Sequence, residues 1–428
     1  MSKYKLDFYN EKSQRFILNI FILTPVVIFF SKFLADFFLS LISIYVLIYL
    51  LKNNKFGPFK YFIFFFIFIF FVSFNLLIQK PDSILFIKSI LLIRFPLFML
   101  FPFIFNFDSK LLTKKFIFIF IFPILIFLIN LYSQAFLNYD IFGNIIKNDY
   151  QRVSSFFGAE YIAGSYLFFI FSIIIIITKD YKISTLIFLA IIYFGILFSG
   201  DRTPFLSINF FLALFFFVNI KKLISNKKFI FTIVLVPSII FLLIYLNSIQ
   251  IINLVAIDKY KGTYKNIIKD IKQKKENENN LGLKRWAYYG LYSKSIVIFK
   301  NNKFFGTTYK SFRNECGKSK YDKDYSSITD GLEYIGCSTH PHNIYLEILS
   351  EQGIFGFIIF ICLIYSFFKL SNTLPYFNNN YYKIFLIVYF FPFKPFGSFY
   401  TNFNLIMFSA TIAFFIIFNK KKINQSHI

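Results

Sequence analysis

The feature that most constrains this fold is a series of long apolar runs that recurs from one end of the chain to the other. Each run holds about 16 to 25 residues, mostly Phe, Ile, Leu and Tyr, and can cross a hydrocarbon core about 30 Å thick as a helix. Inside such a core every backbone polar group needs a partner within the protein, which a helix supplies. The sequence therefore predicts an all-α polytopic membrane protein with about 12 transmembrane helices.

The predicted spans are separated by short connections, with one exception. They cover residues 15–30, 36–51, 60–78, 84–106, 116–132, 159–177, 184–198, 204–219, 229–247, 343–368, 383–397 and 403–418. The long connection, residues 248–341, carries two helical patterns and predicts one large, mostly helical loop domain between helices 9 and 10. The remaining parts are 1–247, with helices 1–9, and 342–428, with helices 10–12 and a tail.

Basic residues in the short connections predict the orientation. If both termini are cytoplasmic, the inside segments hold 21 Lys and Arg residues and the short outside loops hold 6. This excess is typical of cytoplasmic loops, so we expect a multi-pass protein of a bacterial inner membrane with its long loop in the periplasm. The same lysines account for most of the net charge of +25, and nucleic acid is not an expected partner.

Two of the three cysteines, Cys316 and Cys337, lie in the predicted outside loop. A disulfide between them is expected in an oxidising compartment, where closing the loop would stabilise the fold by about 3 kcal/mol. Cys362 lies in the middle of the tenth predicted span. We expect its thiol to pack as an apolar group.

The densest group of chemically useful side chains stands where the long loop meets the tenth span. His340 and His342 lie here, followed by Asn343 and then Glu347. An imidazole can exchange protons near neutral pH, so His342 is a candidate general base. Its alternatives are a structural residue at a helix start and a metal ligand together with Cys337 and His340. Cys316, the other cysteine of the outside loop, is expected in the disulfide with Cys337, and we expect no metal.

An outward-facing transferase has no nucleotide pool and needs a donor that was activated inside, such as a sugar on polyprenyl pyrophosphate. Arginine suits that leaving group because its planar guanidinium meets two phosphate oxygens at once. Arg202, in a short outside turn, and Arg285, in the long loop, are the candidates. A snorkelling residue and a solvated surface charge are their respective alternatives. Arg94, inside the fourth span, and Arg152, just before the sixth, are supporting candidates.

The histidine segment resembles the O-antigen ligase-like membrane proteins, a family of O-antigen ligases, O-antigen polymerases and some protein O-oligosaccharyltransferases. The family signature is His-(Asn/Ser/Gln)-x9-Gly-x2-(Gly/Thr/Tyr). His342, Asn343, Gly353 and Gly356 match it at every place. The pattern of spans and the long loop extend the resemblance over nearly the whole chain.

Two arginine elements add to the resemblance. Arg202 and Leu206 match an Arg-x3-Leu element, and Arg285 with the Asn-rich turn before Gly306 matches a loop-helix arginine. The resemblance implies a metal-independent glycosyl transfer at the periplasmic face, without a cofactor. His342 would activate the acceptor hydroxyl, and the arginines would hold the pyrophosphate. Lysine replaces arginine through much of the loop, which departs from the family pattern.

The implied donor is a glycan on undecaprenyl pyrophosphate, and the implied acceptor is lipid A–core, with membrane lipids around the chain. An O-antigen polymerase that extends a lipid-linked glycan is the nearest alternative, because both enzymes use the same donor. A transporter or flippase is the alternative of a different class. Such proteins usually consist of two similar halves, whereas the long loop here divides the spans nine and three.

Overall fold

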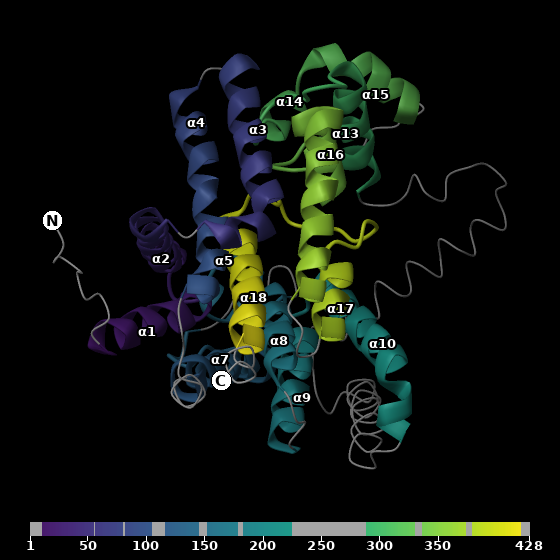
Figure 1. Cartoon of the computed structure of the whole chain (residues 1–428). Coiled ribbons are helices and arrows are strands. Elements are labelled where there is room, and N and C mark those ends of the chain that lie inside the picture. The colour runs from purple at the N-terminus through teal and green to yellow at the C-terminus, as the bar shows by residue number, and fades with distance from the viewer. Residues whose placement is uncertain are drawn as a thin grey trace, which may run out of the picture.

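A computed structural model of the chain describes residues 11–54, 56–79, 82–104, 116–144, 152–178, 183–224, 288–329, 336–373 and 379–420. The regular elements in these ranges are all helices (Figure 1). The all-helical fold is therefore confirmed. The ninth predicted span, residues 229–247, and the first part of the long loop lie outside the described residues.

The bounds of the helices follow in chain order. The α-helices are α1 (Glu11–Val27), α2 (Lys32–Asn53), α3 (Ile63–Gln79), α4 (Ser83–Ile90), α5 (Arg94–Ile104), α7 (Phe122–Leu137), α8 (Ala163–Ile177), α9 (Ile183–Phe198), α10 (Arg202–Ile224), α13 (Tyr289–Asn301), α14 (Phe312–Glu315), α15 (Asp322–Thr329), α16 (Ile344–Thr373), α17 (Asn379–Tyr389) and α18 (Asn402–Lys420). Short 3-10 or π turns are η1 (Gly57–Tyr61), η2 (Leu91–Ile93), η3 (Phe116–Ile121), η4 (Ser155–Phe157) and η5 (Ser319–Tyr321).

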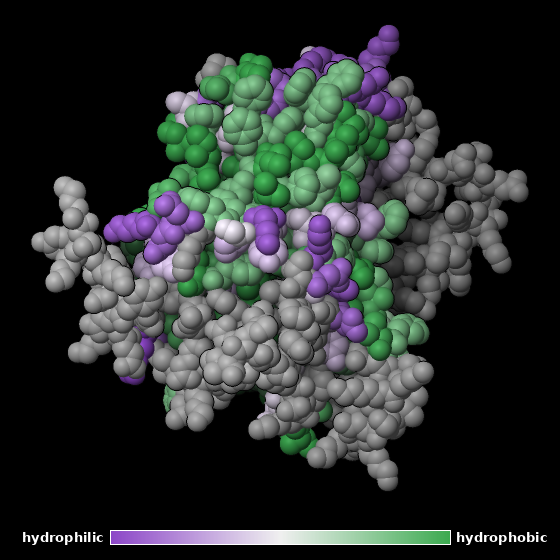
Figure 2. Space-filling model, in the orientation of Figure 1, coloured by the Kyte–Doolittle hydropathy of each residue, from purple (hydrophilic) through white to green (hydrophobic). Residues whose placement is uncertain are grey.

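Several helices are long and apolar enough to cross a membrane. In the described ranges they are Lys32–Asn53, Ser83–Ile104, Phe118–Leu137 and Ile344–Asn372, and shorter apolar helices pack beside them. Apolar side chains cover much of the described surface (Figure 2). Phe33 is 80 % exposed and Phe118 is 78 % exposed, which is typical of side chains that face lipid. The chain is a multi-pass membrane protein, and the number of twelve spans stays a prediction.

The core is built around α5, α8 and α18. Nearly every residue of α8 is buried, and α18 packs against α5 on one side and α8 on another. Aromatic rings fill the space between the helices. Phe414 of α18 lies 5.1 Å from Phe21 of α1, and Phe415 stacks on Tyr382 of α17 at 3.8 Å between ring centroids. Such pairs add specific geometry to the dispersion contacts that hold helices together in lipid.

A second, smaller core lies under α13, α14 and α15, which Figure 1 shows together at one end of the molecule, next to α16. It contains the disulfide between Cys316 and Cys337. After Gly306 the sequence alone predicts an irregular loop up to His340, but the structure forms the short helices α14 and α15 there. Phe312 and Tyr321 pack in this core with apolar side chains of α13. The buried carboxylate of Glu315 also accepts hydrogen bonds from Lys318 at 2.7 Å and Tyr321 at 3.2 Å.

The predicted span 383–397 is also wrong at its end. α17 stops at Tyr389, and an irregular connection covering residues 390–401 leads to α18. Pro392 and Pro395 lie in this connection, and each lacks the N–H that a helix needs. The apolar composition of the stretch hides this break. The connection lies beside the entry to α16, where Phe396 N donates to His342 O at 2.8 Å.

Candidate functional site

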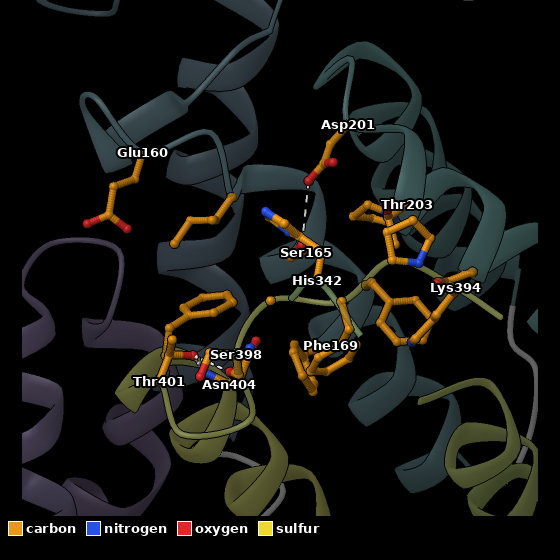
Figure 3. A pocket seen from close by; sticks show the side chains of 18 of the residues that line it. Glu160, Ser165, Phe169, Asp201, Thr203, His342, Lys394, Ser398, Thr401 and Asn404 are labelled. Carbon is orange, nitrogen blue, oxygen red and sulfur yellow. Dashed lines mark hydrogen bonds between the residues drawn. The ribbon is translucent and has the colours of Figure 1, made fainter. Parts of the chain in front are cut away.

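A cavity of about 530 Å³ lies where the entry to α16 meets α8, the start of α10 and the connection between α17 and α18 (Figure 3). Apolar rings from α8, α17 and α18 form one part of its wall. The charged or ionisable part of the wall comprises Lys32, Arg152, Glu160, Asp201, His340, His342 and Lys394. The cavity therefore brings together segments that lie more than two hundred residues apart in the sequence.

His342 lies one residue before the cap of α16 and faces this cavity. Its backbone adopts a left-handed conformation, with a φ of 57°, which is uncommon for a residue other than glycine. The backbone oxygen of His342 accepts hydrogen bonds from Phe396 N at 2.8 Å and from Tyr292 Oη at 3.4 Å. The imidazole lies 5.2 Å from the Tyr288 ring and 4.2 Å from the His340 ring. These contacts hold the ring at one place in the wall.

Burial keeps both imidazoles uncharged near neutral pH. Desolvation lowers the pKa of His342 below its usual value of 6.5. Burial, and next the neighbouring His342, lower the pKa of His340 to about 4. Nδ1 of His340 lies 2.9 Å from Thr339 Oγ1. A neutral His342 with no charged imidazole beside it is able to accept a proton from a substrate hydroxyl.

Asn343 organises the entry to α16. Its Oδ1 accepts hydrogen bonds from the backbone N–H groups of Tyr345 at 3.0 Å and Leu346 at 3.1 Å, as in a helix N-cap. Its Nδ2 donates to the backbone oxygen of Pro392 at 2.7 Å. One side chain therefore starts the helix and ties it to the connection after α17. Asn343, the second residue of the motif, therefore has a structural role.

The motif glycines also have a structural explanation. α16 is interrupted at Gly353, which has a φ of 64°, and the next N–H group, of Ile354, donates to Lys303 O at 2.8 Å. A Cβ on Gly353 would lie 2.3 Å from Phe304 O, and a Cβ on Gly306 would lie 2.3 Å from the carbonyl carbon of Glu351. The segment 303–306 thus crosses α16 in direct backbone contact. Only glycine fits at both crossing points.

Gly356 lies one turn further along α16. A Cβ there would come within 2.9 Å of the Phe71 ring of α3, as well as 2.3 Å from the side chain of Gln352. The absence of a side chain lets α3 approach α16 closely. The second glycine of the signature therefore supports helix packing next to the candidate site.

The two carboxylates of α16 bind backbone groups. Glu347 Oε2 accepts a hydrogen bond from Phe399 N at 2.8 Å, in the connection before α18. Glu351 accepts from Lys310 N at 2.8 Å and Phe312 N at 3.1 Å. Through Phe399, Glu347 holds the connection that carries the cavity residue Ser398.

The predicted arginines occupy different places. Arg152 lines the cavity. Arg202 is the exposed first residue of α10, and its neighbours Asp201 and Thr203 line the cavity. Arg285 lies outside the described residues, three positions before the cavity residue Tyr288.

Arg94 lies behind the wall. Its Nη2 is 2.9 Å from Asp36 Oδ1 of α2 and 3.3 Å from Oδ1 of Asn402, a cavity residue. Its charge is therefore balanced by a neighbouring helix within the bundle. This cation supports Asn402 from behind and is absent from the cavity lining.

Sequence reasoning missed the charged cavity residues Lys32, Glu160 and Lys394. Lys32 and Glu160 form an ion pair between the start of α2 and the segment before α8. Lys394 lies in the connection that was predicted as the end of a span. The sequence does mark Lys394, because it is a charged residue between two prolines in an otherwise apolar run.

The alternative role for His340 and His342 is a metal site that they share with Cys337, and the structure removes Cys337 from that site. The Cys337 sulfur is bonded to Cys316 and cannot act as a thiolate ligand in this state. In the part of the chain that the structure describes, no three His, Cys, Asp or Glu side chains gather as a metal site would need.

A comparison with models of known protein families indicates which type of reaction this cavity serves. Residues 185–361 match the model of the family described as O-antigen ligase. The match supports an O-antigen ligase-like family for this chain. The matched segment of this O-antigen ligase-like protein runs from α9 into α16 and contains His342, whereas Lys394 lies beyond it. No curated protein matches the sequence. That family implies a glycosyl-transfer enzyme of the O-antigen ligase or polymerase type and lipid-linked glycans as its substrates.

Proposed function

We propose that this protein transfers a glycan from undecaprenyl pyrophosphate to a hydroxyl of lipid A–core, the reaction of an O-antigen ligase. One observation carries the proposal. An imidazole whose pKa is lowered by burial lies in the wall of a cavity that also presents Arg152 and Lys394. A base for the acceptor and cations for a pyrophosphate are the two requirements of this reaction.

The proposed step is a single displacement at the anomeric carbon. His342 takes the proton of the acceptor hydroxyl while its oxygen forms a bond to that carbon. The bond from the anomeric carbon to the phosphate oxygen breaks, and undecaprenyl pyrophosphate leaves with the electron pair. Arg152, Arg202 and Arg285 stabilise the charge that develops on the leaving group, as fixed guanidinium groups do for phosphate oxygens.

The proposed topology puts this step outside the cytoplasmic membrane. Residues 1–247 and 342–428 form the membrane part, and residues 248–341 form a periplasmic domain above it. α13, next to α16, belongs to this domain, and Tyr288 just before it contributes to the cavity wall. A lipid-linked donor with its head group at the outer surface would reach the cavity from the bilayer, with its polyprenyl tail among the helices.

The direct test is a transfer assay with the purified full chain in lipid vesicles. The donor is an undecaprenyl-pyrophosphate-linked glycan, and the acceptor is either lipid A–core or a second lipid-linked glycan. We expect product on lipid A–core. Product only on the lipid-linked acceptor would assign a polymerase, and the absence of both products would exclude the proposed function.

A further inference from the structure

Lys394 is a cation of the cavity that the family comparison does not reach. It lies in the connection between α17 and α18, half-buried in the cavity wall. Aromatic rings surround its ammonium group, with Nζ 4.9 Å from the centroid of Phe396, 5.4 Å from Tyr389 and 5.8 Å from Phe168. The rings surround the ammonium with apolar surface, while Asp201, His342 and other polar or charged residues line the same cavity.

The charge of Lys394 has no carboxylate partner among the described residues. Lys32, another cation of the wall, pairs with Glu160, but no salt bridge in the described ranges involves Lys394. Aromatic faces attract an ammonium group but accept none of its hydrogen bonds in the way that oxygen does. Burial therefore lowers the pKa of Lys394. An oxyanion placed in the cavity would supply both the opposite charge and the missing acceptors.

Two hydrogen bonds fix the position of Lys394 relative to the candidate base. On one side of the lysine, Pro392 O accepts from Asn343 Nδ2 at 2.7 Å. On the other side, Phe396 N donates to His342 O at 2.8 Å. The backbone of the connection is thus bound to His342 and Asn343 on both sides of Lys394. These bonds keep Lys394 and His342 in the same wall of the cavity.

We propose that Lys394 is a substrate-binding residue whose ammonium group donates hydrogen bonds to a phosphate oxygen in this cavity. The ligand class is a phosphate ester or pyrophosphate, either of the lipid-linked donor or of a phosphorylated acceptor sugar. This inference rests on the proposed function, because it names a further contact for the same transfer. It gives the C-terminal connection, outside the matched domain, a direct part in binding.

Binding of a small pyrophosphate tests the inference without any transfer reaction. The probe is farnesyl pyrophosphate with the full chain in detergent, and farnesol is the uncharged comparison. Lys394→Met should weaken farnesyl pyrophosphate binding by about ten- to a hundred-fold, the loss expected for a charge-assisted hydrogen bond, and leave farnesol unchanged. Lys394→Arg should keep most of the affinity. Lys383→Met is the matched control, since Lys383 belongs to α17 and does not line the cavity.

Transfer kinetics separate the two sources of phosphate. A higher KM for the lipid-linked donor in Lys394→Met would assign the pyrophosphate as the ligand. A higher KM only for an acceptor that carries phosphate, compared with the same acceptor after phosphatase treatment, would assign the acceptor. Unchanged farnesyl pyrophosphate binding together with unchanged KM for both substrates in the variant would overturn the inference.

A measurement on the unaltered protein covers the case in which Lys394→Met does not fold. Amine acylation followed by mass spectrometry should show that farnesyl pyrophosphate protects Lys394 and leaves Lys383 reactive. Equal labelling of Lys394 with and without the probe would overturn the inference. Failure of the proposed function has a different signature, because unaltered protein would then bind the probe but transfer no glycan.

Discussion

At the residue scale, the structure explains why His342 is suited to proton transfer. Its left-handed backbone is held by two hydrogen bonds to its oxygen, and its ring packs between Tyr288 and His340. Strained backbone conformations persist where surrounding contacts over-determine them, often at functional sites. Here those contacts come from α13 and from the connection after α17, which are far from His342 in the sequence.

Replacement of His342 tests its proposed role as base. His342→Ala should lower kcat for transfer by about two to four orders of magnitude, the usual contribution of a general base. His340→Ala should have a much smaller effect if His342 alone takes the proton. Initial rates with purified protein and lipid-linked donor measure both. Transfer by His342→Ala at the rate of the unaltered protein would exclude the imidazole from the chemical step.

The pH dependence of transfer follows from the lowered pKa of His342. A protonated imidazole cannot accept the acceptor proton, so kcat/KM should fall as pH decreases through a pKa below 6.5. The charged or ionisable neighbours in the same wall are Lys32, Arg152, Glu160, Asp201, Tyr288, His340, Tyr389 and Lys394. A fall in kcat/KM centred above pH 6.5 would contradict its assignment to His342. If the same fall persisted in His342→Ala, it would belong to one of these neighbours.

At the scale of elements, α16 is the scaffold of the site. It was predicted as one continuous span over residues 343–368, but it is interrupted at Gly353, where segment 303–306 crosses it. The backbone N–H groups freed by the break donate to this segment. The crossing therefore fastens the turn after α13 to the helix that begins beside His342.

Substitution of Gly353 should disrupt this crossing. Gly353→Ala places a Cβ 2.3 Å from Phe304 O at a φ of 64°, so we expect a loss of about 2–4 kcal/mol in stability. Gly57→Ala is the matched control, because no atom lies within 4 Å of its added Cβ. Thermal unfolding in detergent compares the two variants. Equal midpoints for both would show that the backbone contact at Gly353 contributes little.

At the scale of the whole molecule, the proposed reaction depends on which face of the membrane carries α13–α15. The disulfide between Cys316 and Cys337 belongs to this domain, and such bonds persist in oxidising compartments. The positive charge of the short connections predicts the same orientation. The cavity beside His342 would then open to the compartment that holds the lipid-linked donor.

Labelling of single cysteines tests this orientation. In a Cys362→Ala background, Lys323→Cys in α15 should react with a membrane-impermeant maleimide in intact spheroplasts. Lys52→Cys, at the end of α2, should react only after the membrane is permeabilised. Both positions are exposed in the structure. The reverse pattern would place the cavity in the cytoplasm and exclude a reaction with an outward-facing donor.

Much of the candidate site was accessible from local sequence, but the assembly of its wall was not. The position of His342 at a helix entry, and its motif with Asn343, follow from neighbouring residues. The contribution of Lys394 required the connection after α17 to fold back onto that entry. The placement of Arg94 behind the wall likewise required its contact with Asp36 of α2.

The sequence by itself determined a helical membrane protein and a resemblance to the O-antigen ligase family, whose model matches residues 185–361. The length of an apolar run and the spacing of a motif can be read from neighbouring residues. In a bilayer, the backbone must satisfy its own hydrogen bonds, which few structures other than a helix can do. Only the tertiary structure decided which cations share a cavity with His342, because that depends on contacts between distant segments. It also showed that the motif glycines serve backbone crossing and helix packing, since only the folded chain brings segment 303–306 and α3 against α16.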